Sequence, residues 1–175
     1  MGGPGTESDL IERVINIKRV SKVVKGGKQL KLSASVVVGD GRGQVGLGHG
    51  KSKEVAVAVR KATARARKDM VSVATTGRTI PHETIGKFGA SRVIVRPASE
   101  GTGLIACSQV RAVLEAAGLR DALSKSLGSR NPYNSARATI VALQKLRTID
   151  QVAASRNKPT RHLTPKARHD EADQG

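Results

Sequence analysis

The apolar and polar positions of residues 36–70 predict two strands joined by a tight turn and followed by a helix. Valines lead into an Asp-Gly step at Asp40, which is the strongest short-range signal of a hairpin. In the returning strand, side chains alternate with glycines at Gly46, Gly48 and Gly50. Because alternate residues of a strand point to opposite faces, one face is bare backbone, and we expect another element to pack closely on it.

The segment behind these glycines predicts an amphipathic helix. From Val55 to Met70, apolar side chains recur at the spacing of one helical face. Much of the remaining surface is basic and carries Lys53, Arg60, Lys61, Arg65, Arg67 and Lys68. The helix therefore combines a core stripe with a broad basic face.

The chain before the hairpin predicts two more strands joined by a basic loop. Residues 10–24 alternate in the manner of a first strand, and residues 29–38 return as a second. One face of the first strand is expected to carry Val14, Asn16, Lys18 and Val20. The loop over residues 22–28 is rich in lysine and glycine, so it either lays ammonium and backbone groups against phosphate or is an ordinary hairpin loop with solvated lysines.

Two nucleotide-binding patterns nearly fit the glycine-rich stretch. The G-x-G-x-x-G string that begins at Gly41 needs a helix directly after its turn, whereas a strand is expected there. Gly50-Lys51 matches the end of a P-loop, but the first glycine of that motif would fall on Val45. We therefore favour the hairpin.

The C-terminal half predicts a second set of elements. Residues 91–96 alternate as a strand, residues 104–117 have helical spacing, and residues 132–146 form the last expected helix, capped by Asn131. The glycine-rich loop 98–103 lies before the first of these helices. It is either an anion nest for phosphate or a plain capping turn.

The charge balance indicates a polyanionic partner. The 175 residues include 31 Lys and Arg against 14 Asp and Glu, a net charge of +17, which is far more than solubility requires. The sequence shows no long apolar run, secretory signal or lipid-facing amphipathic helix with Trp or Phe. Nucleic acid is therefore favoured over a membrane surface.

Aromatic and cysteine content narrows the kind of nucleic acid. Tyr133 and Phe88 are the only Phe, Trp or Tyr residues, so we expect the base-stacking platform of single-strand readers to be missing. A basic surface without aromatics suits the backbone of folded, largely double-helical RNA. Cys107 is the single cysteine, which predicts no disulfide framework and a cytosolic setting.

No constellation of catalytic or metal-binding residues is recognisable. His82 and Glu83 are neighbours, and neighbours on a strand point to opposite faces. Glu100 would stand alone, without the carboxylate and metal set that phosphoryl transfer needs. His162 and His169 are far in sequence from other ligand types. We expect no catalytic residue, no metal and no cofactor.

Several strings in chain order resemble a single family. They are RVSKVVKGG at residues 19–27, VGDG at 38–41, GLGHGK at 46–51, PASEGTG at 97–103, RAVLE at 111–115 and GSRNP at 128–132. From about residue 10 to residue 155 the chain resembles the fifth protein of the small ribosomal subunit, the S-five family. It departs from that family at Cys107-Ser108-Gln109, where a Gly/Ala-rich run is familiar, and at His49, where an aromatic residue is common.

The resemblance implies an α+β fold with two domains. Residues 10–73 would form a three-stranded sheet with a helix, similar to a double-stranded RNA-binding fold. Residues 74–155 would form a small α/β sandwich with two helices on a sheet. Residues 1–9 are expected to be a flexible N-terminus, and residues 156–175 a polar, disordered tail.

The resemblance also implies a function. The protein would be a cytoplasmic, non-enzymatic constituent of the 30S ribosomal subunit that binds 16S ribosomal RNA and supports subunit assembly and translational accuracy near the decoding region and the messenger entry path. The loop from Ser21 to Lys28 would reach the ribosomal RNA helix where spectinomycin acts. The residues expected to bind RNA are Arg19, Ser21, Lys22, Lys25, Gly26, Gly27, Lys28, Arg42, Lys51, Lys53, Arg60, Lys61, Arg65, Arg67 and Lys68.

Protein partners are implied as well. The neighbouring small-subunit proteins S-four and S-eight are expected at the surface, with Gly103 and Arg111 at a protein interface. Two functions of other classes stay open from the sequence. They are a free-standing double-stranded RNA-binding module and a nucleotide-dependent enzyme.

Overall fold

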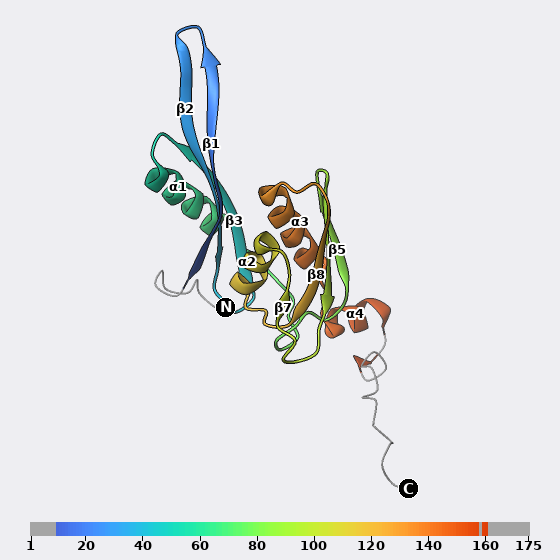
Figure 1. Ribbon diagram of the computed structural model, residues 1–175. Coiled ribbons are helices and arrows are strands. Elements are labelled where there is room, and N and C mark those ends of the chain that lie inside the picture. The colour runs from blue at the N-terminus through green and yellow to red at the C-terminus, as the bar shows by residue number, and fades with distance from the viewer. Residues whose placement is uncertain (1–9, 158, 161–175) are drawn as a thin grey trace.

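The computed structural model describes residues 10–157 and 159–160. It contains two four-stranded sheets, with strand orders β1-β2-β3-β4 and β5-β6-β8-β7. Figure 1 shows helices packed on both, so the predicted α+β class is confirmed. The first sheet and its helix consist of β1 (Ile11–Val24), β2 (Gly27–Gly39), β3 (Gln44–Ser52), α1 (Val55–Lys68) and β4 (Val71–Ser72).

β1 and β2 extend beyond the rest of the first sheet as a two-stranded arm, which we define as residues 19–31. Within the described residues, β3 pairs with β2 only from Leu32 onward, so no third strand supports the arm. In Figure 1 the arm projects from the top of the molecule. Its turn is short, because only residues 25–26 lie between the two strands. The predicted loop over residues 22–28 is therefore mostly strand.

The bare glycine face of β3 is covered by α1. Gly46, Gly48 and Gly50 are all buried. A Cβ added at each would overlap, in turn, the backbone carbonyl oxygens of Ala66, Ala62 and Ala58. The expectation that an element packs closely on this face is confirmed, since strand and helix backbones are in direct contact.

A β-bulge in β1 decides which of its side chains face the second domain. Val14 pairs with Val36, whereas Asn16 pairs with Ser35, so Ile15 is the extra residue. An inserted residue moves every later side chain to the opposite face. Val14 and Asn16 therefore lie on opposite faces. The prediction that they share one face is wrong, because an alternation pattern does not reveal a bulge.

The second domain has two helices against one face of its sheet. Its elements are β5 (Thr84–Phe88), β6 (Ser91–Pro97), β7 (Leu104–Ile105), α2 (Ser108–Ala116), β8 (Ala122–Gly128), α3 (Pro132–Gln144) and α4 (Ile149–Arg156). α3 packs on β5 and β6, and α2 packs on α3 and on the first sheet. In Figure 1, α2 and α3 lie between the two sheets. The predicted arrangement of two helices on a sheet is confirmed.

Several elements of the second domain differ from the predictions. The helix predicted over residues 104–117 begins only at Ser108, because Leu104–Ile105 forms β7 and pairs in parallel with β8. The sequence does not predict β8, because the segment ALSKSLG lacks apolar–polar alternation and its partner strands are distant in sequence. The helix over residues 132–146 is not the last. α4 follows it and includes Arg156, which the sequence predicts to be the first residue of the polar tail. The rest of that tail lies largely outside the described residues.

The two domains share one core through the second face of the first sheet. Val37, Val45 and Leu47 of that sheet join a buried apolar cluster with residues of α2 and α3. At the edge of this contact, Arg13 of β1 lies 3.5 Å from the carboxylate of Glu115 on α2. The domains are therefore packed together, with the first sheet covered by α1 on one face and by α2 and α3 on the other.

The glycine turn that mimics a dinucleotide fingerprint docks the end of α2. The backbone N–H of Gly41 donates to the carbonyl of Ala116 at 3.1 Å, and that of Gly43 donates to the carbonyl of Ala117 at 3.0 Å. The last carbonyls of a helix lack intrahelical donors, so these bonds satisfy them. The turn joins two strands and its amides have protein partners, which confirms the hairpin and leaves no phosphate cradle at Gly41 and Gly43.

Candidate nucleic-acid interface

The arm presents the densest set of expected RNA-binding residues. Arg19, Ser21, Lys22, Lys25, Gly26, Gly27 and Lys28 are all exposed. No ion pair in the part of the chain that the structure describes involves the arm lysines. Two apolar side chains are also exposed there, Val23 at 72% and Leu30 at 46%. The arm is therefore a basic and partly apolar hairpin that no third strand supports.

The basic side chains of α1 lie around its exposed surface, outside the stripe of Ala58, Ala62 and Ala66 that packs on the glycine strand. Lys53 precedes the helix and is exposed, as are Arg60, Lys61, Arg65 and Lys68. Arg67 differs from them, since it is half-buried and its guanidinium binds the carboxylate of Glu12 on β1 at 3.2 Å. Arg67 therefore ties α1 to the first strand.

Arg42 lies apart from the other expected RNA ligands. It is exposed in the turn between β2 and β3, whereas the arm is at the opposite end of β2. Its backbone N–H donates to Asp40 Oδ1 at 2.8 Å. The structure does not bring Arg42 together with the arm.

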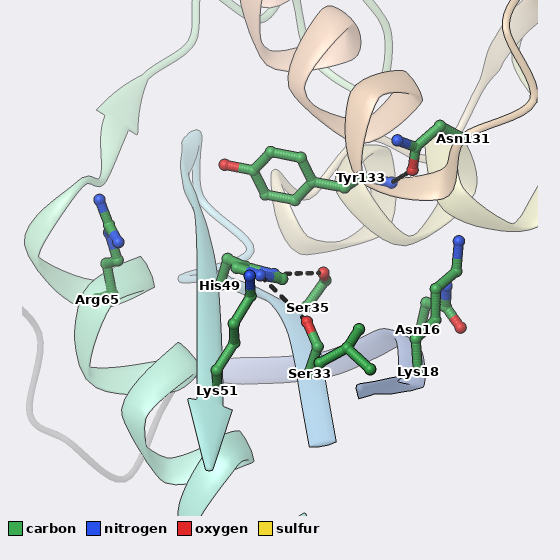
Figure 2. Close-up of a pocket in the computed structure, with 10 residues that line it drawn as sticks. Asn16, Lys18, Ser33, Ser35, His49, Lys51, Arg65, Asn131 and Tyr133 are labelled. Atoms are coloured by element: carbon green, nitrogen blue, oxygen red, sulfur yellow. Dashed lines mark hydrogen bonds between the residues drawn. The ribbon is translucent and has the colours of Figure 1, made fainter. Parts of the chain in front are cut away.

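A cleft of about 340 Å³ opens between the first sheet and the start of α3 (Figure 2). Its floor consists of two cross-strand rows, Asn16-Ser35-His49 and Lys18-Ser33-Lys51. The remaining lining residues are Val20, Arg65, Asn131 and Tyr133. Of these ten, only Lys51 and Arg65 were predicted as RNA ligands, because the others are brought together by the bulge in β1 and by packing between domains.

His49 is held at the centre of this cleft. Its Nε2 lies 3.1 Å from the hydroxyl oxygen of Ser33, and its Nδ1 lies 3.2 Å from that of Ser35. Burial lowers the pKa of His49, and the positive charges of Lys51 and Arg65 lower it further. A neutral imidazole has one donor and one acceptor nitrogen, which two serine hydroxyls can satisfy.

Tyr133 lies beside His49 and is in turn contacted by Phe88. The ring of Tyr133 meets the ring of His49 edge-on, with centroids 5.4 Å apart, and Phe88 meets Tyr133 at 6.5 Å. Tyr133 is positioned by the start of α3, where Asn131 accepts a hydrogen bond from the Tyr133 N–H at 3.3 Å. Folding therefore brings the two aromatic residues of the chain together, and Tyr133 lines the cleft.

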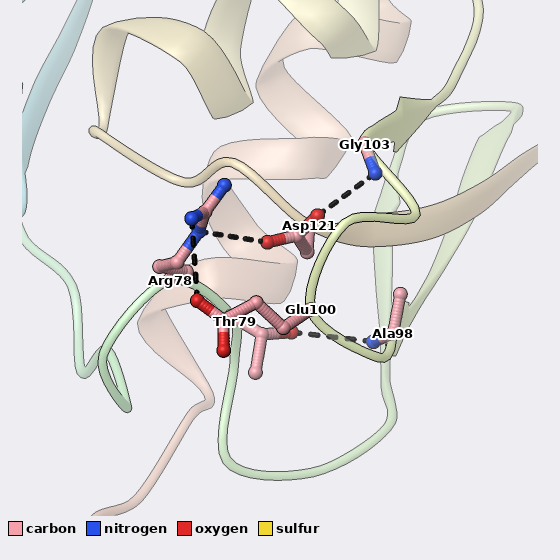
Figure 3. Close-up of polar contacts among 6 residues, drawn as sticks. All are labelled: Arg78, Thr79, Ala98, Glu100, Gly103 and Asp121. Carbon is pink, nitrogen blue, oxygen red and sulfur yellow. Dashed lines mark hydrogen bonds and ion pairs between the residues drawn. The ribbon is translucent and has the colours of Figure 1, made fainter.

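The glycine-rich loop 98–103 is closed by a carboxylate of the chain itself (Figure 3). Asp121 Oδ1 accepts a hydrogen bond from the Gly103 N–H at 2.8 Å, and Asp121 Oδ2 binds the guanidinium of Arg78 at 3.1 Å. Arg78 also pairs with Glu100 at 3.2 Å. The loop leads into β7 and not into a helix. The capping-turn prediction is therefore wrong, whereas the anion nest stays a prediction, with the Gly103 N–H already bound by Asp121.

Comparison with known proteins decides the family. Residues 10–74 match the ribosomal protein S5 N-terminal domain, and residues 86–156 match the ribosomal protein S5 C-terminal domain. The chain belongs to the ribosomal protein S5 family. Both halves match in chain order, and the arm and α1 lie in the first of them.

Relatives named small ribosomal subunit protein uS5 match over most of their length. The protein from Thermosynechococcus vestitus is 53% identical over 161 residues, covering 91% of this chain and 92% of the relative. That from Magnetococcus marinus is 52% identical over 159 residues, covering 90% of each. That from Syntrophobacter fumaroxidans is 47% identical over 158 residues, covering 90% of this chain and 95% of the relative.

Within this S5 fold, the residues expected at a protein interface lie in the second domain. Arg111 is exposed on α2. Gly103 has a φ of +75°, a conformation that L side chains rarely adopt, and is half-buried where its N–H meets Asp121.

The described part of this S5 protein holds no acid–base pair at His82 and Glu83. His82 Nδ1 lies 2.9 Å from the backbone carbonyl of Glu83, and its Nε2 accepts the Arg147 N–H at 3.2 Å. The Glu83 carboxylate binds Arg96 at 2.8 Å. Over the described residues, no three His, Cys, Asp or Glu side chains form a potential metal cluster, and no helix is long and apolar enough to cross a membrane.

Proposed function

We propose that this protein is anchored in the small ribosomal subunit by its arm and the basic face of α1, which bind the phosphate backbone of 16S ribosomal RNA. As a member of the ribosomal protein S5 family, it is a structural, non-enzymatic constituent of the small subunit that binds ribosomal RNA in translation. It is located in the ribosome, in the cytoplasm. The proposal adds which surfaces make the RNA contacts.

The proposal depends mainly on the exposed lysines of the arm. A two-stranded hairpin without a packed face is marginally stable alone in water. The arm nevertheless extends past the sheet and exposes Lys22, Lys25 and Lys28 around a two-residue turn. Lysine ammonium groups neutralise phosphates and release counterions, and such contacts supply much of the affinity for nucleic acid. RNA that surrounds the arm would complete it.

The basic face of α1 provides a second contact. Arg60, Lys61, Arg65 and Lys68 are exposed on one helix that is clamped to β3 through the glycine face. A rigid row of cations suits the regular phosphate spacing of double-helical RNA, which proteins recognise mainly by shape, phosphate and 2′-OH. The RNA-bound side of the first domain would then include the helix as well as the arm.

We also propose that the second domain contacts neighbouring proteins of the small subunit. Arg111 and Gly103 lie in the second domain, away from the arm, and we assign them to contacts with neighbouring proteins, S-four and S-eight. A planar guanidinium at an exposed helix position suits a partner carboxylate. We also propose, from the family resemblance, that the protein lies near the decoding region and the messenger entry path and affects translational accuracy.

Sedimentation of cell extracts tests the anchoring directly. The chain should migrate with small subunits in low-salt and high-salt gradients, because a protein anchored over many phosphates stays bound while loosely associated factors dissociate. The variant in which Lys22, Lys25 and Lys28 are all Ala should dissociate at lower salt. A chain that stays at the top of both gradients would instead be a free-standing RNA-binding module.

A further inference from the structure

We propose that the cleft between the first sheet and α3 receives one unpaired RNA nucleotide, with its base against Tyr133 and its phosphate between Lys18 and Lys51. The inference rests on the proposed function, since the nucleotide would belong to the ribosomal RNA that the arm and α1 hold. It adds a site that recognises an unstacked base, in contrast to the backbone contacts of the arm. The cleft volume of about 340 Å³ is within the range of small-molecule sites.

The floor of the cleft provides the charge for a phosphate. Lys18 and Lys51 flank Ser33 in one cross-strand row, so their backbones lie about 10 Å apart and their long side chains can converge on one anion. Arg65 lines the same cleft from α1. None of its lining residues is acidic. A site with three cations and no carboxylate attracts an anion and repels a metal ion.

The wall of the cleft provides the aromatic surface. Tyr133 projects over the cleft from the start of α3 in Figure 2, and its ring is fixed by an edge contact with His49. Stacking on an aromatic ring is the usual way in which proteins hold a splayed RNA base. Tyr133 and Phe88 are the only Phe, Trp or Tyr residues of the chain, and one of them lines this basic cleft.

Two amide side chains stand at the ends of the cleft. Asn16 ends the row that contains Ser35 and His49, and Asn131 caps α3 beside Tyr133. The amide of Asn16 offers a donor and an acceptor, and Asn131, whose Oδ1 accepts the Tyr133 N–H, offers its NH2 donors; together these groups suit the edge of a nucleobase. Base-paired RNA cannot present that edge, because it is already hydrogen-bonded within the duplex. The arrangement therefore favours an unpaired nucleotide over a duplex backbone.

Binding to matched RNAs tests this inference. The probes are a fluorescent RNA duplex and the same duplex with one bulged nucleotide, made with each of the four bases, and the readout is fluorescence anisotropy with the full chain. We expect at least one bulged RNA to bind about tenfold more tightly than the duplex, in keeping with the contribution of one stacked base. Replacing Tyr133→Leu should remove that preference while duplex affinity is retained.

Matched variants separate the site from general effects. Phe88→Leu makes the same change at the neighbouring aromatic, which does not line the cleft, and should keep the preference. Tyr133 also packs against the core, so Lys18→Ala and Lys51→Ala provide a second test at exposed residues that do not endanger folding. Each should weaken binding of the bulged RNA more than binding of the duplex.

Three outcomes would overturn the inference. The first is equal affinity of the wild type for all bulged and plain duplexes. The second is a bulge preference that survives Tyr133→Leu and both lysine variants. The third is that free AMP displaces the bulged RNA at a concentration similar to the Kd of that RNA, which would make the cleft a site for free nucleotides. In the first two cases, duplex binding that depends on the arm lysines would still support the proposed function. If the wild-type protein bound none of the RNAs, the proposed anchoring by the arm and α1 would itself be refuted.

Discussion

A Cβ added to Gly48 would overlap the carbonyl oxygen of Ala62, because β3 and α1 meet there backbone to backbone. The helix cannot retreat locally, since Gly46 and Gly50 make the same kind of contact with Ala66 and Ala58. Glycine at these positions sets the distance between the helix and the sheet. The basic face of α1 therefore depends on a strand with no side chains on one side.

Substitution of Gly48 should destabilise the first domain. We expect Gly48→Ala to lower the free energy of unfolding by about 1–3 kcal/mol, as other overpacking substitutions do, and Gly48→Val to lower it further. Urea unfolding measures the effect. Gly26→Ala is the control, because a Cβ at Gly26 in the arm turn meets nothing within 4 Å. If Gly48→Ala were as stable as the wild type, the backbone contact between β3 and α1 would be contradicted. For Gly48→Val we also expect poor incorporation into the small subunit.

Asp121 should matter for stability through the loop that it closes. Its carboxylate is buried and accepts from the Gly103 N–H and the Arg78 guanidinium. Asp121→Ala leaves both donors without this acceptor, and we expect a loss of about 1–3 kcal/mol in the free energy of unfolding. Asp121→Asn retains one acceptor oxygen for Gly103 and should lose less. Equal losses for the two variants would show that the carboxylate charge facing Arg78, and not the hydrogen bond from Gly103, stabilises the loop.

The environment of His49 predicts a pH dependence of stability. Its folded pKa lies below the ordinary value of 6.5, so the unfolded chain binds the proton more readily than the folded one. The free energy of unfolding should therefore fall as the pH drops below about 6.5, and this contribution should vanish above it. His49→Gln removes it. Thermal unfolding from about pH 7.5 to about pH 5.5 should show a smaller decrease in Tm for the variant, and parallel curves would contradict the prediction.

Arg111 should affect protein contacts more than RNA binding. Exposed ion pairs contribute less than about 1 kcal/mol, so Arg111→Leu should leave folding and ribosomal RNA affinity nearly unchanged. We expect altered misreading in a reporter assay, through a loosened contact with the S-four protein. Arg92→Leu makes the same change at another exposed arginine, on β6, and should have no such effect. Unchanged misreading with a steep fall in RNA affinity would make Arg111 a phosphate ligand.

Local sequence signals predicted the parts of the fold that local chemistry decides. The Asp-Gly step at Asp40 marks the hairpin, the glycines of β3 mark the face under α1, and Asn131 caps α3 as expected. Each of these depends on a few neighbouring residues. The exposed lysines of the arm were predictable for the same reason, because a basic segment between two alternating runs has nowhere to be buried.

Features that depend on distant pairings were not predictable. The bulge at Ile15 changes the facing of Asn16 and Lys18, yet leaves no mark in the alternation pattern. The cleft needs that bulge and the packing of α3 against the first sheet, which brings Tyr133 to His49 across 84 positions of sequence. Likewise, the buried carboxylate of Asp121 binds the Gly103 N–H of the glycine loop, a contact that only the fold reveals.

The salt dependence of RNA binding by an arm variant shows whether the arm lysines contact phosphates of ribosomal RNA. The variant has Lys22, Lys25 and Lys28 replaced by Ala, and its affinity for 16S ribosomal RNA is measured over a series of salt concentrations beside the wild type. We expect the variant to bind more weakly, with its circular dichroism spectrum unchanged. The slope of log binding constant against log salt concentration should flatten by roughly 0.7 to 0.9 for each phosphate that the arm no longer neutralises. An unchanged slope with intact secondary structure would show that the arm lysines are only solvated, and would contradict the claim.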